Sequence, residues 1–359
     1  MSTPFAIPLT DVAVPEQDVR AVLAALDRGW RANGPLTRDF EEAFAAWHGR
    51  PAAAAAAVSS GTASLHLALA ALGIGPGDEV LVPAMTFVAT AAAVRYVGAT
   101  PVLCDAVSPE RPLLDAADAA ARVTARTRAV LPVHFGGYPA DDVALRALCA
   151  EHGLLMVEDC AQAVGARLPG GGLAGTAGAA GCFSFFSKKQ LCAGEGGAVL
   201  ASHPAVAARV RELRESGVPQ TFSDAHAALA SSRLTRLAGA IDARRAAVRA
   251  YRERLAGLAG LTLPFSGADV ELSSHFAFMV ILPDRAARDA ARAGLHARGI
   301  QTTWYPALTM FSEYAGGPRL PRATEFAQRH LVLPLSSSTT TERVDAVVTA
   351  LREVLAPSS

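Results

Sequence analysis

Lysine is almost missing from this chain of 359 residues. The sequence contains two lysines, Lys188 and Lys189, and its other strongly basic residues are all arginines. A guanidinium stays protonated and is a poor nucleophile, whereas an ammonium group can lose its proton and attack a carbonyl carbon. Either the pair is an unimportant part of an arginine-rich surface, or this position needs an amine. The surrounding residues favour the second interpretation.

The chain also lacks a charge excess, long apolar runs and paired cysteines. Its formal net charge is zero without a basic block, so we expect no nucleic acid as a partner. Charged residues, Gly or Pro interrupt every apolar run and the N-terminus resembles no secretory signal, so we expect neither membrane insertion nor export. The cysteines are Cys104, Cys149, Cys160, Cys182 and Cys192. Their odd number and the absence of metal-type spacing are typical of a reduced cytoplasmic protein, and we expect no metal.

Hydrophobic residues make up 51% of the sequence, enough for the core of one large and one smaller domain. From about residue 58, helix-like and strand-like segments alternate, which predicts an α/β fold with a mostly parallel, buried sheet. The expected helices are Thr62–Leu72 and Thr86–Val97. The expected strands are Val80–Val82, Thr100–Leu103, Ala129–Val133, Leu154–Val157, Phe183–Phe186 and Ala198–Leu200, with Ala52–Ala57 as a strand or its lead-in.

Helical periodicity dominates from about Asp224 to Leu258 and leads into a second domain. We expect a large domain over 1–240 and a small C-terminal domain over 241–359. In the small domain the pattern predicts a strand at Phe276–Leu282 and helices at Arg285–Arg298 and Thr341–Leu355.

The first chemical motif is VSSGTAS, which ends just inside a helix. Gly61 lets the backbone approach a ligand, Thr62 offers a hydroxyl, and the first turn of the helix presents free N–H groups. Such a helix N-terminus suits a phosphate. An ordinary helix cap by Ser60 or Thr62 explains the same residues equally well.

The second motif is VEDCAQA, in which an apolar strand ends in two carboxylates at the sheet edge where α/β proteins bind ligands. One of these acids could hold a protonated ring nitrogen, although a strand-end Asp is also a common helix cap. A nearby run, Gly170, Gly172 and Gly175, fits a dinucleotide motif. Pro169 precedes it and no good helix follows, so we interpret it as a loop.

The third motif, CFSFFSKKQLCAGEGG, carries an aromatic strand into the lysine pair and then into a glycine-rich turn. The three motifs together offer a phosphate anchor, a carboxylate for a ring nitrogen and an amine that can form an imine. This is the set that pyridoxal 5′-phosphate requires.

With these motifs in place, the chain resembles the DegT/DnrJ/EryC1/StrS family of sugar aminotransferases. The resemblance covers nearly the whole length through GWRANGP, SSGTASLHLAL, GPGDEVLVPAMTFVAT, PVHFGG, EDCAQAVGA, GCFSFFSKK, SDAHAAL and LPL. It implies a fold-type I, aspartate aminotransferase-like enzyme that uses pyridoxal phosphate, with a mixed, mostly parallel sheet in its large domain.

The resemblance also assigns roles to individual residues. The family's Schiff-base lysine falls on Lys189, counted from Ser184, and leaves Lys188 without a role. The other implied positions are Gly61, Thr62 and Ser184 at the phosphate, Phe87 stacked on the pyridine ring, Asp159 at the ring nitrogen and Gln162 near the ring and its phenolic oxygen. As alternatives, Phe87 could be a core residue, Gln162 a helix-surface amide and Lys189 a structural lysine.

The implied reaction is a two-stage transamination. Glutamate or glutamine would leave its amino group on the cofactor, and a keto sugar, usually carried by a nucleoside diphosphate, would accept it. The resemblance further implies a homodimer with shared active sites. GEGG at 194–197 resembles members that aminate carbon 4, which favours a 4-keto-deoxy sugar in an amino-sugar or antibiotic pathway.

Two departures from the family pattern concern substrate handling. The family's cross-subunit Asn falls on Pro219 and a nearby Arg on Thr221, while Trp304 replaces a frequent His. These changes leave open an aminocyclitol-type reaction on a cyclic ketone. A sugar dehydratase would carry His in place of Lys189, and a non-catalytic relative is the remaining alternative.

Overall fold

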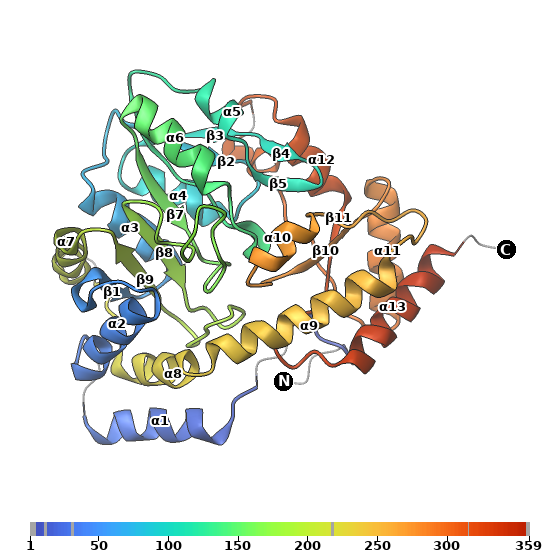
Figure 1. Ribbon diagram of the computed structural model, residues 1–359, viewed down its shortest axis with the longest axis horizontal. Helices are drawn as coiled ribbons and strands as arrows, with labels where there is room; N and C mark the ends of the chain where they lie inside the picture. The colour runs from blue at the N-terminus through green and yellow to red at the C-terminus, as the bar shows by residue number, and fades with distance from the viewer. Residues whose placement is uncertain (1–4, 11–12, 30–31, 217–218, 315, 357–359) are drawn as a thin grey trace.

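The computed structural model describes the chain except for residues 1–4, 11–12, 30–31, 217–218, 315 and 357–359. A seven-stranded sheet lies at the centre of the large domain, in the order β1-β9-β8-β7-β6-β2-β3 (Figure 1). Neighbouring strands are parallel except at β9, which runs antiparallel to both β1 and β8. The strands are β1 (Ala55–Val58), β2 (Glu79–Pro83), β3 (Thr100–Cys104), β6 (Thr127–Val130), β7 (Leu155–Asp159), β8 (Ala180–Ser184) and β9 (Gly197–Ala201).

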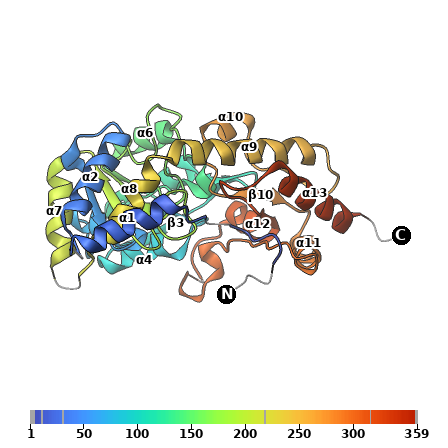
Figure 2. The same cartoon turned by 90° about the horizontal axis from the view of Figure 1, so that it is seen from below.

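Helices cover both faces of this sheet, which is why its strands are apolar on both sides. On β2, Val80 and Val82 belong to the core that contains α4, while Leu81 between them belongs to the core that contains α6. Figure 2 shows α4 and α6 on opposite sides. The helices of this domain are α1 (Glu16–Asp27), α2 (Pro35–Trp47), α3 (Gly61–Ala71), α4 (Val88–Tyr96), α5 (Ala116–Ala120), α6 (Asp142–His152), α7 (Pro204–Glu215) and α8 (Asp224–Leu234).

The long helix α9 (Leu237–Leu255) crosses the molecule in Figure 1. We use the predicted names for the two parts of the chain, the large domain before this helix and the small domain after it. Its two strands, β10 (Phe278–Ile281) and β11 (His330–Leu333), pair antiparallel. Its helices are α10 (Gly267–Leu272), α11 (Arg285–Ala297), α12 (Pro321–Arg329) and α13 (Thr341–Leu355). The remaining elements are the hairpin β4 (Ala106–Ser108) and β5 (Arg111–Leu114), and the short 3-10 helices η1 (Ala52–Ala54), η2 (Phe135–Gly137), η3 (Leu308–Met310) and η4 (Ser312–Tyr314).

Most expected elements occur at or near their predicted positions, with three informative differences. The strand expected at Ala129–Val133 ends at Val130, because Pro132 has no N–H to continue the ladder. The helix expected over Asp224–Leu258 is two helices. Between them the Thr235 hydroxyl donates to the Ser232 carbonyl at 2.8 Å, a local bond that competes with helix continuation.

The third difference is the strand expected at Phe183–Phe186, which runs from Ala180 to Ser184. Its pairing with β9 ends at Ser184, and the Phe186 side chain beyond it is exposed. The aromatic run therefore marks the exit of the strand rather than its centre.

The N-terminal segment lies against the small domain, although it precedes the large domain in sequence. Ile7 pairs with Ile300, the Leu9 N–H donates to Gln301 Oε1 at 2.9 Å, and the Leu335 N–H donates to the Leu9 carbonyl at 3.0 Å. These contacts tie residues 7–9 to the later part of the chain. The division into two domains at residue 240 stays a prediction.

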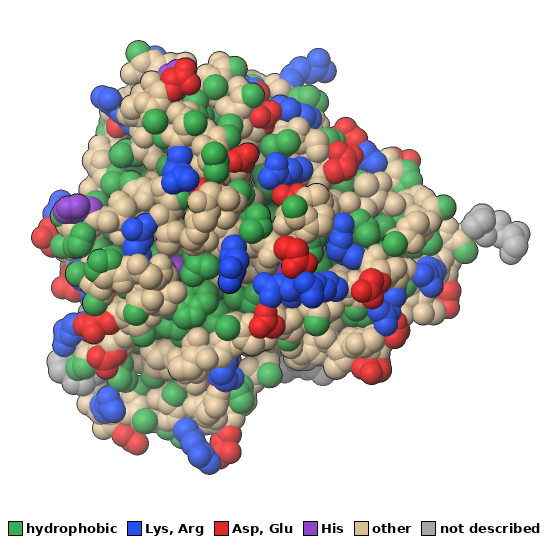
Figure 3. Space-filling view, viewed as in Figure 1, with side chains coloured by type: hydrophobic (Ala, Val, Ile, Leu, Met, Phe, Trp, Pro, Cys, Tyr) green, Lys and Arg blue, Asp and Glu red, His purple; other side chains and the backbone are tan. Residues whose placement is uncertain are grey.

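No helix in the described part of the chain combines the length and apolar character needed to span a bilayer. On the face drawn in Figure 3, acidic and basic side chains are interspersed, as the neutral net charge leads one to expect.

Candidate active site

A cavity of about 940 Å³ is lined by residues from the earlier and the later part of the chain, and its size is typical of small-molecule sites. We call the residues that sequence motifs supply the large-domain wall, and the cavity-lining residues of α11 and the segment after it the small-domain wall. The large-domain wall contains all seven predicted site residues: Gly61, Thr62, Phe87, Asp159, Gln162, Ser184 and Lys189. The small-domain wall includes Arg292, His296, Gln301, Thr302, Thr303 and Tyr305.

The N-terminus of α3 opens onto this cavity. Ser60 is its N-cap, and the Ser60 Oγ accepts from the Ala63 N–H at 3.0 Å, so the ordinary cap interpretation is correct for Ser60. It leaves the N–H groups of Gly61 and Thr62 for an anion. A Cβ on Gly61 would lie 2.7 Å from the Ser184 Cβ, so glycine is needed here for α3 to approach β8. The same approach brings Gly61 and Ser184 to one spot.

The two carboxylates at the end of β7 point to opposite faces of the strand and have different surroundings. Asp159 lines the cavity, accepting from the Thr90 hydroxyl at 2.8 Å and from the Ala161 N–H at 3.0 Å. Burial raises the pKa of Asp159, while these hydrogen bonds and the nearby Lys189 oppose the rise. Asp159 is therefore a buried acid that a cationic partner in the cavity would stabilise as a carboxylate.

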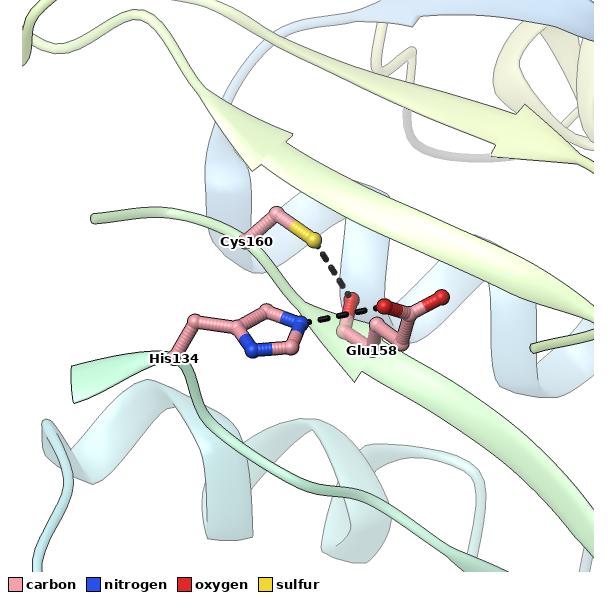
Figure 4. Close-up of side chains that lie close together, drawn as sticks. All are labelled: His134, Glu158 and Cys160. Atoms are coloured by element: carbon pink, nitrogen blue, oxygen red, sulfur yellow. Dashed lines mark hydrogen bonds and ion pairs between the residues drawn. The ribbon is translucent and has the colours of Figure 1, made fainter. Parts of the chain in front are cut away.

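Glu158 is buried behind the cavity, next to His134 and Cys160 (Figure 4). Its carboxylate accepts from His134 Nε2 at 3.0 Å and from the backbone N–H groups of 175, 177 and 178 at 2.8–2.9 Å. Burial by itself raises the pKa of Glu158, but these hydrogen bonds lower it below its usual range. Although Cys160, His134 and Glu158 could be grouped as metal ligands, the carboxylate oxygens are already used, and Glu158 instead holds the loop between β7 and β8.

That loop contains Gly170, Gly172 and Gly175 and has no helix between β7 and β8. The loop interpretation of the glycine run is therefore confirmed. A Cβ on Gly175 would meet the Phe183 ring at 2.4 Å, which gives this glycine a packing reason.

Lys189 follows β8 and is half-buried, with its backbone N–H donating to the Phe186 carbonyl at 2.8 Å. Burial lowers the pKa of Lys189 to about 8, against the opposing attraction of Asp159. An amine with this pKa is neutral in a substantial fraction of molecules near neutral pH, and so can act as a nucleophile or a base. Lys188, in contrast, is exposed, although it also lines the cavity.

The surroundings of Phe87 and Gln162 do not fit the alternatives of a core residue and a helix-surface amide. Phe87 precedes α4 and is 68% exposed, so it is not a core residue and its ring is available to stack on a flat ligand. Gln162 is buried and not helical, and its Oε1 accepts from the Gly136 N–H at 2.7 Å.

Sequence reasoning missed two residues beside the predicted ones. Thr90, one turn into α4, fixes a carboxylate oxygen of Asp159. Phe276 comes from the small domain and places its ring 4.7 Å from Lys189 Nζ, a cation–π distance. The TFVAT spacing could have indicated Thr90, because Phe87 and Thr90 share one helical face, but no local pattern links Phe276 to Lys189.

The departures from the family pattern lie outside the cavity lining. Pro219 and Thr221 are not among its lining residues, and the carbonyl of Gln220 between them accepts from the Ser59 N–H at 3.0 Å. Trp304 packs against the buried guanidinium of Arg288, 4.3 Å from its ring centroid, and does not line the cavity either. Residues 217–218, in the shortened loop, and Trp30 and Arg31 of the GWRANGP segment lie outside the described residues.

Comparison with known proteins agrees with this geometry. Residues 13–352 match the DegT/DnrJ/EryC1/StrS aminotransferase family. The chain is 40% identical to a UDP-N-acetyl-3-dehydro-alpha-D-glucosamine 3-aminotransferase of Acidithiobacillus ferrooxidans, with 83% of each chain covered. It is 39% identical to the dTDP-3-amino-3,4,6-trideoxy-alpha-D-glucose transaminase of Streptomyces venezuelae, covering 97% of this chain and 96% of the relative.

Among solved structures, Streptomyces venezuelae DesV in complex with a ketimine intermediate superposes with a TM-score of 0.89 at 37% identity, covering 98% of each chain. The predicted fold class is confirmed by this similarity together with the mixed, mostly parallel sheet.

Proposed function

Because the chain belongs to the DegT/DnrJ/EryC1/StrS aminotransferase family, we propose that it moves an amino group from glutamate or glutamine to a nucleotide-linked keto sugar in amino-sugar biosynthesis. The family resemblance expected from the sequence motifs is confirmed, and with it aminotransferase activity. The observation that carries the proposal is Lys189, an amine of lowered pKa that shares a cavity with Asp159 and the N-terminus of α3.

Pyridoxal 5′-phosphate is the cofactor, and its chemistry is that of an electron sink for the substrate carbon that carries nitrogen. The residues present fit this group. The N-terminus of α3 with Gly61, Thr62 and Ser184 would hold the phosphate, and Asp159 would keep the ring nitrogen protonated. The exposed ring of Phe87 would stack on the pyridine, and the amide of Gln162 would lie near its edge.

Lys189 would act twice. Its neutral amine would hold the cofactor, and the free amine would remove and return the proton at the substrate carbon. Arginine could do neither at neutral pH. The same residue argues against a sugar dehydratase, whose members carry His at this position, and against a non-catalytic relative.

The acceptor is argued from the relatives. Both curated relatives described above are named for amino groups at carbon 3 of a nucleotide-linked sugar, whereas GEGG at 194–197 favours carbon 4. A 4-keto-deoxy sugar therefore stays a prediction, and an aminocyclitol-type ketone is the alternative. Trp304 lies against Arg288 and away from the cavity lining, so its replacement of His no longer supports an unusual acceptor.

A homodimer with shared active sites and a cytoplasmic location also stay predictions. An apolar stripe on α1, formed by the exposed side chains of Val19, Leu23 and Leu26, supports association with another copy. The five cysteines are all buried and unpaired, which supports a reducing compartment.

The experiment begins with the visible spectrum of the purified protein. Bound cofactor should absorb in the visible range, and glutamate should bleach this band. Labelled glutamate should then pass its nitrogen to one of a panel of 3-keto and 4-keto nucleotide sugars and cyclic ketones. A chromophore that glutamate and glutamine leave unchanged would contradict the proposed donor, and transfer only to a cyclic ketone would select the alternative acceptor.

A further inference from the structure

The small-domain wall presents hydrogen-bond donors that no other described residue of the protein uses. The acids that line the cavity, Asp159 and Glu195, both belong to the large-domain side. On the opposite side the lining residues include Arg292, His296, Gln301 and Thr302. The cavity therefore has a donor-rich region facing away from its acids.

Arg292 is the unpaired arginine of α11. Arg288 is buried and pairs with Asp289 at 2.6 Å, and Arg285 pairs with the same carboxylate at 3.6 Å. Arg292 makes no ion pair or hydrogen bond to any described residue. It shares one helical face with His296, four residues later, and both line the cavity.

Thr302 supplies a second unused donor beside this helix. It is 3% exposed, and its Oγ1 has no hydrogen-bond partner among the described residues. Its backbone is fixed, because its N–H and carbonyl both lie 3.1 Å from His296 Nε2. A buried hydroxyl without a partner costs free energy unless a ligand satisfies it.

Gln301 completes the set. Its Oε1 accepts from the Leu9 N–H, so the amide orientation is fixed and the NH₂ side is left as a donor toward the cavity. Phe5 closes the same region, with its ring 5.0 Å from His296 in an edge-on contact. Gln301 and Thr302 are thus held in place by backbone and side-chain contacts before any ligand arrives.

We propose that Arg292, Gln301 and Thr302 form the recognition site for an anionic oxygen group of the substrate, either a carboxylate of the amino donor or a phosphate of the nucleotide-linked acceptor. Guanidinium, amide and hydroxyl donors on a stretch of the cavity lining that carries no carboxylate are the chemistry that both groups require. This inference deepens the proposed function and rests on it for the identity of the substrate. It assigns the recognition of the substrate to the small domain and leaves the making and breaking of bonds to the large-domain wall.

The test measures binding apart from turnover. Calorimetry of the holoenzyme would use three probes that cannot react: UDP and dTDP for the phosphate source and glutarate for the carboxylate source. The variants are Arg292→Gln and Thr302→Val, with Arg285→Gln as the matched control, because Arg285 is exposed on the same helix and does not line the cavity. Melting temperatures would show that each variant is folded.

Arg292→Gln should weaken one class of probe by about 10–100-fold, the value of a charge-assisted hydrogen bond. Thr302→Val should weaken the same class by about 3–10-fold, the range for a neutral hydrogen bond. A loss confined to the nucleoside diphosphates assigns the site to the acceptor, and a loss confined to glutarate assigns it to the donor. Unchanged affinities in both variants, or no binding of any probe by wild type, would overturn the inference. Failure of the proposed function would appear separately, as a wild-type chromophore that glutamate does not bleach.

Discussion

The two walls of the cavity are built in different ways. The large-domain wall is made of strand ends and helix starts, where Asp159 ends β7, Ser184 ends β8 and Gly61 begins α3. Each position follows from the local pattern of its own segment. The small-domain wall is made of one helix face and an irregular segment, and its donors come from positions that carry no motif.

This difference separates chemistry from selection. The amine of Lys189 belongs to the large-domain wall and lies near Asp159, and the ring of Phe276, from the later part of the chain, is 4.7 Å from it. Side chains that act in the same way on every substrate can be fixed at the sheet edge. Side chains that determine which substrate binds can vary on α11 without disturbing the sheet. The predictions that follow test this division from its strongest consequence to its weakest.

The largest effect is expected at the lysine pair. Lys189→Ala removes the amine that we propose holds the cofactor and carries the proton, so amino transfer from glutamate should fall by at least about a thousandfold. Lys188→Ala is the matched control: its side chain is exposed, and its turnover should stay within a few-fold of wild type. If Lys188→Ala were the inactive variant, the count from Ser184 would be wrong.

The next effect separates the two carboxylates of β7. In Asp159→Asn the amide oxygen can still accept from the Ala161 N–H and the amide nitrogen can donate to the Thr90 hydroxyl, so the fold should persist. The charge at the ring nitrogen is lost, and the glutamate half-reaction should slow by about 100–10,000-fold, the range for a positioned catalytic group.

Glu158→Gln is the comparison. Its carboxylate accepts four hydrogen bonds from donors, and an amide NH₂ in place of one oxygen leaves some of those donors unpaired. We expect a loss of roughly 2–4 kcal/mol in the free energy of unfolding, with the activity of folded protein kept within about tenfold. A stable but inactive Glu158→Gln protein would mean that the roles of the two acids have been exchanged.

The sequence predicted the large-domain wall because its residues obey local rules. An apolar strand followed by a carboxylate, or a small-residue turn before a helix, identifies a site at the edge of a parallel sheet whatever the tertiary context. Even there, the local pattern alone does not distinguish Glu158 from Asp159, since the alternation of side chains decides which acid faces the cavity only once the strand register is known. The family resemblance made that choice, in favour of Asp159.

The small-domain wall could not be predicted for a physical reason. Arg292 is one of several arginines on an amphipathic helix, and its sequence neighbours do not show that Asp289 neutralises Arg285 and Arg288 and leaves Arg292 unpaired. Nor does the sequence show that the N-terminal segment crosses to Gln301. Both facts depend on long-range packing, as does the contact between Phe276 and Lys189.

A smaller effect concerns stability against pH in protein freed of cofactor. The pKa of Lys189 is lowered by burial to about 8, whereas an unfolded lysine titrates near 10.4. Between these values the unfolded chain binds more protons, so the free energy of unfolding rises with pH, and the contribution is constant outside this window.

Lys189→Met lacks this group and is the reference. From pH 8 to 10, wild type should gain roughly 1–3 kcal/mol relative to Lys189→Met, measured by denaturant unfolding of both proteins at each pH. Other ionisable groups cancel in the difference. A constant difference across the window would show that burial does not hold the amine in a lowered-pKa state.

The smallest effect tests whether the small domain reaches the reacting amine. The Phe276 ring lies 4.7 Å from Lys189 Nζ and favours the charged form of the amine. Phe276→Leu keeps an apolar side chain but removes this attraction, so the pKa of Lys189 should fall further, by up to about one unit. The onset of the pH-dependent gain in stability should move to lower pH by the same amount. In a Lys189→Met background the Phe276→Leu change should leave the pH dependence untouched. An equal shift in both backgrounds would assign it to other groups, and the contact between Phe276 and Lys189 would then be one of packing alone.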